Sequence, residues 1–435
     1  MSKKNFQKYI TFNKTNLLLV LLALLLITIP IKPIFGSIAV ILFTIVSFSG
    51  VYKLNFKPNT ALFLPIALYV LMVLSLLWTT SNIHTLSGLQ KEASLLVLPL
   101  AFLFLPKLDK KSSYKVFHWF GFGMAAFGIF SISIAFIRYF DTGNQNVFIF
   151  NNLITAEVNA IYIAAFASFC LFYFIALKNK KTIDFVAIYI LAVFIFLLYS
   201  KTIFFIDALL LVWYYLKKGT AQKSVKWVTL IMGATFLFLS IIYVPQVRER
   251  FKQEYQTAFV DNTIYSETGI KDKNSNYITI KKAWTNSEFH PQSYFPGTAF
   301  RVFQIRIFLE TFQEQNLWFK GLGQDASELS IKDKHKQYQL FNEYRYFNFH
   351  NQYIQIFAEL GVFGFIIFLI MVFLNFKNAL SNNNFLHFVF AFTMIVLFLT
   401  ESMLCRQRGI LFFITLYCIF NSVDFKTKEK LVKKS

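Results

Sequence analysis

Charged side chains are scarce in this sequence. They make up 15% of its 435 residues, against 56% hydrophobic residues, and the mean hydropathy is +0.52. A soluble domain carries about 25% charged residues. The shortage excludes an ordinary soluble protein and indicates a chain that crosses a membrane many times.

Cysteines and metal-binding patterns are also few. The three cysteines, Cys170, Cys405 and Cys418, lie in or at the edge of apolar segments and show no ligand spacing, so we see no disulfide framework. The chain has no Asp-x-Asp, no His-Glu-x-x-His and no pair of histidines at ligand spacing. We therefore expect neither a metal nor another cofactor.

Apolar segments, in contrast, are abundant. A membrane-spanning helix needs about 20 mostly apolar residues, and the sequence predicts twelve such helices in an all-α, polytopic membrane protein. The first has a basic start like a signal peptide but no small-x-small cleavage site, so we expect it to be retained. The twelve segments are 16–31, 34–51, 60–78, 88–105, 116–137, 157–177, 182–200, 202–216, 227–244, 351–376, 385–403 and 409–420.

Lysine placement predicts the orientation of these helices. Lysines recur in alternate loops and in the tail, and basic residues in short loops mark the cytoplasmic side. Both termini are therefore predicted to be cytoplasmic. The net charge of +21 is then a consequence of topology, and a nucleic-acid partner is not expected because the lysines form no single patch.

One long polar stretch interrupts the apolar segments. It divides the chain into residues 1–244 with nine helices, an outer loop domain at 245–350, and residues 351–435 with three helices and a basic tail. The loop ends at His350, where the next apolar segment begins. On a helix, His350, Tyr353, Phe357, Gly361 and Gly364 would share one face.

All eight arginines are predicted on the outer side, where positive charge is normally avoided. An arginine binds phosphate through a bidentate fork, whereas a lysine acts as a point charge. The set indicates an anion site, although pairing with acids of the loop, such as Glu310 and Glu314, would explain any single member. The eight are Arg138, Arg248, Arg250, Arg301, Arg306, Arg345, Arg406 and Arg408.

Several short motifs follow one another in this region. Ser200-Lys201 lies at a tight turn between two apolar segments, and Arg301 is followed by Gly321-Leu322-Gly323. His350-Asn351-Gln352-Tyr353 then leads to Glu359-Leu360-Gly361. This order resembles the O-antigen ligase and O-antigen polymerase family of bacterial envelope glycosyltransferases.

The resemblance implies a GT-C-like membrane enzyme with a periplasmic loop in the bacterial inner membrane. Such enzymes transfer a glycan from undecaprenyl diphosphate to an acceptor hydroxyl, with inversion and without a metal. The acceptor is lipid A core or another surface molecule for a ligase, and the growing chain for a polymerase. The two alternatives stay open here.

The resemblance also assigns roles to residues. His350 is the candidate general base, since histidine titrates near neutral pH. Lys201 and Arg301 are the candidates for binding the diphosphate. Arg306 stays open, because the family tends to have a tryptophan four residues after the loop arginine, whereas this sequence has Ile305 there, followed by Arg306. The family usually has arginine at position 201. The supporting residues are Asn351, Tyr353, Glu359 and Gly361.

A transporter of lipid-linked oligosaccharides is the alternative from another class. Such proteins commonly carry internal repeats with broken helices at matched positions in the two halves. The sequence shows no such symmetry, and its single long loop is off-centre. The enzyme interpretation is therefore favoured.

Overall fold

The computed structural model describes residues 3–49, 55–106, 108–154, 159–217, 255, 276–290, 293–340 and 348–422. Of these, the side chains of 3–15, 276, 277 and 294 are not described. The predicted helix at 227–244 and much of the predicted loop domain lie outside the described residues, as do Arg248, Arg250 and Arg345.

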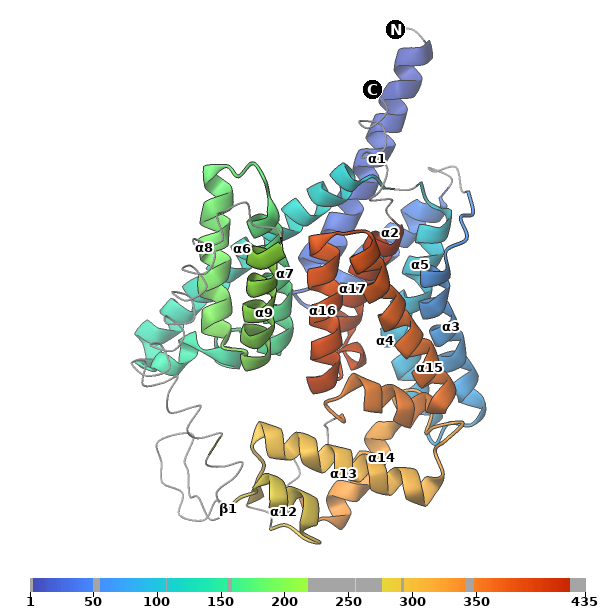
Figure 1. Ribbon diagram of the computed structural model, residues 1–435, viewed down its shortest axis with the longest axis vertical. Helices are drawn as coiled ribbons and strands as arrows, with labels where there is room; N and C mark the ends of the chain where they lie inside the picture. Colours follow the sequence, from blue (N-terminus) through green and yellow to red (C-terminus); the bar gives the residue numbers. More distant parts are fainter. Residues whose placement is uncertain are drawn as a thin grey trace.

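A bundle of helices forms most of the molecule (Figure 1). Its N-terminal part contains α1 (Lys3–Thr28), α2 (Pro33–Phe48), α3 (Thr60–Leu74), α4 (Asn82–Glu92), α5 (Ser94–Phe104), α6 (Lys110–Thr142), α7 (Ala160–Ala176), α8 (Thr182–Leu198) and α9 (Lys201–Lys217). The bundle is completed by α15 (Gln352–Ser381), α16 (Phe385–Thr400) and α17 (Gln407–Ser422). Short 3-10 helices follow α3, α6 and α16, at Ser75–Leu77, at Gln145–Phe148 and Phe150–Asn152, and at Met403–Cys405 (η5).

Each predicted apolar segment that falls in the described residues overlaps a helix, and the segment 88–105 covers the end of α4 and all of α5. Four of the described helical stretches are long and apolar enough to cross a membrane, namely Thr60–Leu77, Asn82–Phe104, Lys110–Thr142 and Gln352–Ser381. Several further apolar helices are shorter, with 10–17 residues. The all-α membrane class agrees with these helices, and the count of twelve spans stays a prediction.

Asparagines fix the starts of several bundle helices. The side chain of Asn59 accepts from Ala61 N, that of Asn159 from Ile161 N, and that of Asn384 from Leu386 N. A side-chain oxygen at this position satisfies one of the backbone N–H groups that a helix leaves without a partner at its first turn. These caps define where the chain turns back into the bundle.

The centre of the bundle is α17 with α7 beside it. Nearly every residue of α17 is buried, and its Phe412 ring lies 4.4 Å from the ring of Phe166 on α7. Because α17 has apolar neighbours on all sides, it forms the packing core around which the outer helices are arranged.

A smaller domain lies against one end of the bundle, opposite to the end where α1 begins (Figure 1). It contains α12 (Ile280–Thr285), α13 (Gly297–Gln315) and α14 (Ser327–Gln337). The two-residue strands β1 (Asn276–Tyr277) and β2 (Ser293–Tyr294) pair in parallel, with Asn276 opposite Ser293. The domain has its own apolar core, which includes Phe289, Phe295 and Phe303.

The small domain is joined to α15 by backbone hydrogen bonds. Gly361 breaks α15 with φ 64° and ψ −162°. Around this break, Ala358 O accepts from Leu322 N, Glu359 O accepts from Gly323 N, and Val362 N donates to Trp318 O. The loop thus replaces helical hydrogen bonds that the break removes. The Gly-x-Gly and Glu-x-Gly motifs therefore meet in space.

This break corrects the predicted helical face. His350 lies before α15, because Asn351 is its N-cap and the helix begins at Gln352. Beyond the break, Gly361 and Gly364 no longer continue the periodicity of Tyr353 and Phe357. A Cβ atom on Gly361 would lie 2.4 Å from Phe319 O, so this glycine admits a loop backbone and not another helix.

Candidate functional site

The histidine at the end of the loop is held in an unusual backbone conformation. His350 has φ 50°, which costs a non-glycine residue on the order of 1–3 kcal/mol. Its backbone N–H donates to Asn348 Oδ1 at 2.9 Å. The next residue, Asn351, donates its backbone N–H to Ser402 Oγ and caps α15 by accepting from Ile354 N. These bonds stabilise the strained turn that presents the imidazole.

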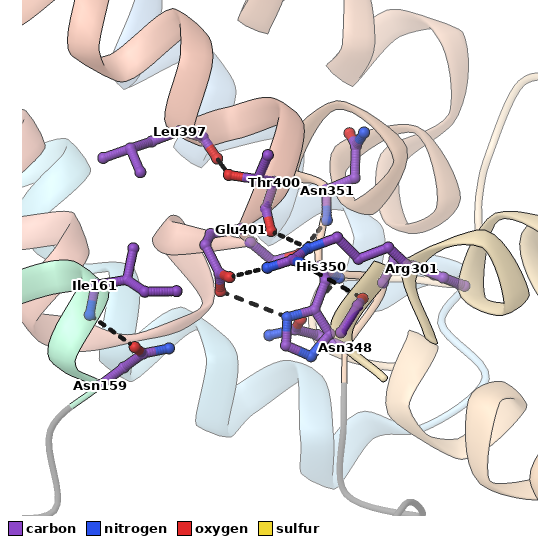
Figure 2. A network of polar contacts seen from close by, with 12 residues as sticks. Asn159, Ile161, Arg301, Asn348, His350, Asn351, Leu397, Thr400 and Glu401 are labelled. Atoms are coloured by element: carbon purple, nitrogen blue, oxygen red, sulfur yellow. Dashed lines mark hydrogen bonds and ion pairs between the residues drawn. The ribbon is translucent and has the colours of Figure 1, made fainter. Parts of the chain in front are cut away.

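Arg301 and His350 meet at one carboxylate, that of Glu401. Arg301 Nη2 lies 2.8 Å from Glu401 Oε1, and His350 Nδ1 lies 3.4 Å from Glu401 Oε2 (Figure 2). Arg301 Nε also donates to Thr400 O at 2.9 Å. Three distant parts of the sequence, α13, the end of the loop and the end of α16, are therefore joined in one charged group.

The Glu401 carboxylate stays ionised in this arrangement. Burial would raise its pKa, since only 5% of the side chain is exposed, but the hydrogen bond from His350 and the charge of Arg301 outweigh burial and lower the pKa. A charged Glu401 next to Nδ1 holds a proton on that nitrogen and leaves Nε2 as the basic nitrogen.

Arg306 is committed to a different network. Its Nε donates to Glu310 Oε1, its Nη1 to Asn286 O, and its Nη2 to Tyr338 Oη. Burial and the hydrogen bond to Glu310 raise the pKa of Tyr338 to about 12. Arg306 thus ties α13 to the end of α12 and to the residue after α14. Its pairing with Glu310 is the structural role that the sequence offered as an alternative to anion binding.

Lys201 begins α9 directly after the tight turn. Two residues, Tyr199 and Ser200, separate α8 from α9; Tyr199 has φ 48°, and Ser200 Oγ accepts from Ile203 N. Tyr162, near the start of α7, donates to Ser402 O, and α8 runs back alongside α7 (Figure 1). The turn therefore lies at the end of the bundle that carries Glu401.

The other predicted supporting residues, Tyr353, Glu359 and Gly361, hold α15 against α16 and the small domain. Tyr353 donates its hydroxyl to Ile395 O and so links α15 to α16. Glu359 is buried and accepts from Ser327 Oγ and Gln355 Nε2. Gly361 forms the break in α15. In the described residues, none of these three residues contacts Glu401, Arg301 or His350 through these bonds.

Sequence reasoning missed Glu401. The predicted helix 385–403 ran through it, whereas α16 ends at Thr400 and Glu401 is its C-cap. A signal was present, since an acid at the end of an apolar segment is costly unless it is paired.

Across the described ranges, no group of three or more His, Cys, Asp or Glu residues is placed to hold a metal ion. The expected independence from a metal stays a prediction.

Comparison with known families adds an independent finding. Residues 186–369 match a family model described as O-antigen ligase. The matched segment contains Lys201, Arg301 and His350 but ends before Glu401. The predicted resemblance to this family is confirmed over that segment. A comparison with curated proteins gives no match.

Proposed function

From the family to which residues 186–369 belong, we propose that this protein is an O-antigen ligase that transfers a glycan from undecaprenyl diphosphate to an acceptor hydroxyl. The family indicates a role for this membrane protein in glycan transfer during O-antigen assembly. The proposal adds the donor, the acceptor class of lipid A core or another glycan, and the periplasmic face of the inner membrane. Both termini are then cytoplasmic.

The observation that carries the proposal is the joining of Arg301 and His350 through Glu401. A transfer from a lipid diphosphate needs a base for the acceptor hydroxyl and a cation for the departing diphosphate. The two groups contact different oxygens of one carboxylate, which lies where the small domain meets the bundle (Figure 2). This junction is where a lipid-bound diphosphate at the membrane surface would meet the acceptor hydroxyl.

The proposed reaction proceeds in one displacement. His350 Nε2 takes the proton from the acceptor hydroxyl, and its oxygen attacks the anomeric carbon of the donor sugar. The bond between that carbon and the diphosphate oxygen breaks, and the electron pair leaves with undecaprenyl diphosphate. Attack opposite to the leaving group inverts the anomeric centre.

Arg301 retains hydrogen bonds for such a leaving group. A guanidinium has five N–H donors. Among the described residues three of them are used, on Thr400 O, Glu401 Oε1 and Gly297 O, and the other two have no partner there. The side chain is 31% exposed. We propose that these two donors bind the diphosphate, together with the ammonium group of Lys201.

A polymerase uses the same chemistry and differs only in its acceptor, so it is the second candidate within the family. A flippase is a candidate of another class. It would move the lipid-linked glycan without needing a base, and the charged group around Glu401 favours the enzyme.

The test is transfer by the purified protein from a purified undecaprenyl-diphosphate glycan. General-base assistance contributes about 10²–10⁴ in rate, so H350A should lose transfer by at least about 10²-fold while it still binds the donor. H350Q keeps a hydrogen-bonding side chain but cannot take the proton. Near-normal turnover by H350Q would remove the assignment of His350 as the base.

The same assay separates the candidates. Transfer to lipid A core indicates a ligase, and extension of the lipid-linked chain alone indicates a polymerase. Transport of the donor across vesicles with no transfer to any acceptor would contradict the enzyme proposal.

A further inference from the structure

A polar cavity of about 260 Å³ adjoins the loop that carries His350. Its walls come from five parts of the chain: the end of α4, the start of α14 with Asp325 before it, the loop before α15, the first turn of α15, and η5 with the residue after it. Lys91, Glu328, Asn348 and Arg406 are among the lining residues. The cavity thus lies between the bundle and the small domain.

The cavity and the proposed base share a wall. Asn348 lines the cavity, and its Oδ1 accepts from the backbone N–H of His350 (Figure 2). Gln355 lines the cavity as well, and its Oε1 accepts from Phe349 N. A molecule in the cavity would therefore contact the same side chains that hold the histidine turn.

The charges on the cavity wall cancel. Two cationic side chains, Lys91 and Arg406, face two acidic ones, Asp325 and Glu328, and Lys91 is ion-paired with Asp325. A diphosphate would require a net positive site. The balance of charge instead suits a ligand without a formal charge of its own.

The wall also offers both donors and acceptors. Within the part of the chain that the structure describes, the Arg406 guanidinium, the Glu328 carboxylate and the Asn348 amide nitrogen make no side-chain hydrogen bond or ion pair. A sugar hydroxyl donates one hydrogen bond and accepts others. Two donor groups and one acceptor group around one cavity therefore match a sugar ring.

We propose that this cavity binds the sugar ring of the acceptor that carries the attacking hydroxyl. The inference rests on the proposed function, because it assigns the second substrate of the same reaction. Glu328 accepts from sugar hydroxyls, and Arg406 and the Asn348 amide donate to them. Asn348 links this site to His350, so the bound ring lies next to the base.

The first test separates the two substrates by kinetics. E328Q and R406Q each weaken a charged hydrogen bond to the ring, which corresponds to a rise of about tenfold in the KM for core oligosaccharide. The KM for the undecaprenyl-diphosphate glycan should stay within about twofold. A rise in the donor KM instead, or no change in either KM, would overturn the proposal.

A matched control comes from the same helix. Asp333 on α14 is 76% exposed and does not line the cavity. D333N removes one negative charge, as E328Q does, and should leave both KM values unchanged. A rise in the acceptor KM for D333N would mean that the charge of α14, and not the cavity, controls acceptor binding.

The second test needs no turnover. Cys405 lines the cavity and is partly exposed, whereas Cys170 and Cys418 are buried. A small methanethiosulfonate reagent should therefore label Cys405, and C405S should remove the labelling. The reaction is run at alkaline pH, since burial raises the pKa of this thiol.

Deacylated core oligosaccharide should slow this labelling severalfold, and the undecaprenyl-diphosphate glycan should not. Protection by the donor alone, or by neither molecule, would overturn the assignment. The result is independent of the proposed donor, because protection by the oligosaccharide is measured without transfer. A protein that is protected but never transfers from the lipid diphosphate would contradict the proposed function and leave the sugar site standing.

Discussion

The carboxylate of Glu401 lies 3.4 Å from Nδ1 of His350, although the two residues are 51 positions apart in the sequence. The same carboxylate binds Arg301 through its other oxygen. One buried acid therefore positions both the proposed base and the proposed cation. Its loss should affect the chemical step more than the binding of either substrate.

Replacing Glu401 by glutamine tests this positioning role. E401Q keeps the size of the side chain but removes the charge that favours a proton on Nδ1, so kcat should fall by about 10²-fold or more. The KM values should change little, and E401D should recover part of the activity. An unchanged kcat for E401Q would show that His350 needs no acidic partner.

The pH dependence of stability provides a second prediction. The pKa of Glu401 is lowered in the folded protein despite its burial, by His350 and Arg301. Its ion pairs therefore contribute stability that is fully present well above the unfolded pKa of about 4.5 and is lost as the pH falls through the lower folded pKa. The Tm difference between the wild type and E401Q should be constant from about pH 7 to pH 5.5 and shrink below about pH 4.5. A difference that grows on acidification would contradict this sign.

Replacing Arg301 and replacing Arg306 should have different effects, the first on the transfer rate and the second on the Tm. R301A should nearly abolish transfer while the protein still accumulates, because its exposed donors are proposed to bind the diphosphate. R306A should mainly lower the Tm, since Arg306 joins α12, α13 and Tyr338. Transfer rate and Tm are measured for both, and the reverse ranking would mean that Arg306 binds the donor.

Lys201 is tested by its own pair of variants. K201A should lose transfer, and K201R should retain it because the positive charge remains and arginine binds phosphate with two donors. Normal transfer by K201A would exclude the turn between α8 and α9 from the donor site.

Gly361 should be intolerant of any side chain. Its φ of 64° strains an alanine by about 1 kcal/mol or more, and the Cβ atom would also collide with Phe319 O. Gly143 is the matched control, since it has φ 67° and no atom within 4 Å of its Cβ position. The Tm in detergent should fall clearly more for G361A than for G143A, and equal losses would mean that the contact with the loop is unimportant.

The sequence predicted the regular parts of this protein well and the junctions poorly. Helix positions follow from long apolar segments and asparagine caps, which are local features. Glu401 could not be linked to His350 in this way, because their contact depends on how α16 ends against the loop. The break at Gly361 was also missed, since a glycine in an apolar segment is compatible with a regular helix until its partner, Phe319, is known.

The arginines illustrate the same limit. In the sequence, Arg301 and Arg306 have the same side-chain chemistry and the same predicted side of the membrane, and both lie on α13. They are distinguished by the packing of α12 and Tyr338 around Arg306 and by the ion pair of Arg301 with Glu401. Residue type alone therefore indicated a basic region, and the separate networks emerged from the tertiary structure.

The broken helix α15 has a consequence for how the protein is made. Residues 318–323 are synthesised before residues 358–362, so the loop backbone already exists when the break in α15 is formed. Until the two segments meet, Ala358 O, Glu359 O and Val362 N lack the partners that they have in the finished protein, and a buried backbone group is costly to leave unpaired. The loop backbone thus supplies the partners around which the break in α15 forms. A fragment of the small domain expressed alone would expose the loop groups that make these bonds, namely Trp318 O, Leu322 N and Gly323 N.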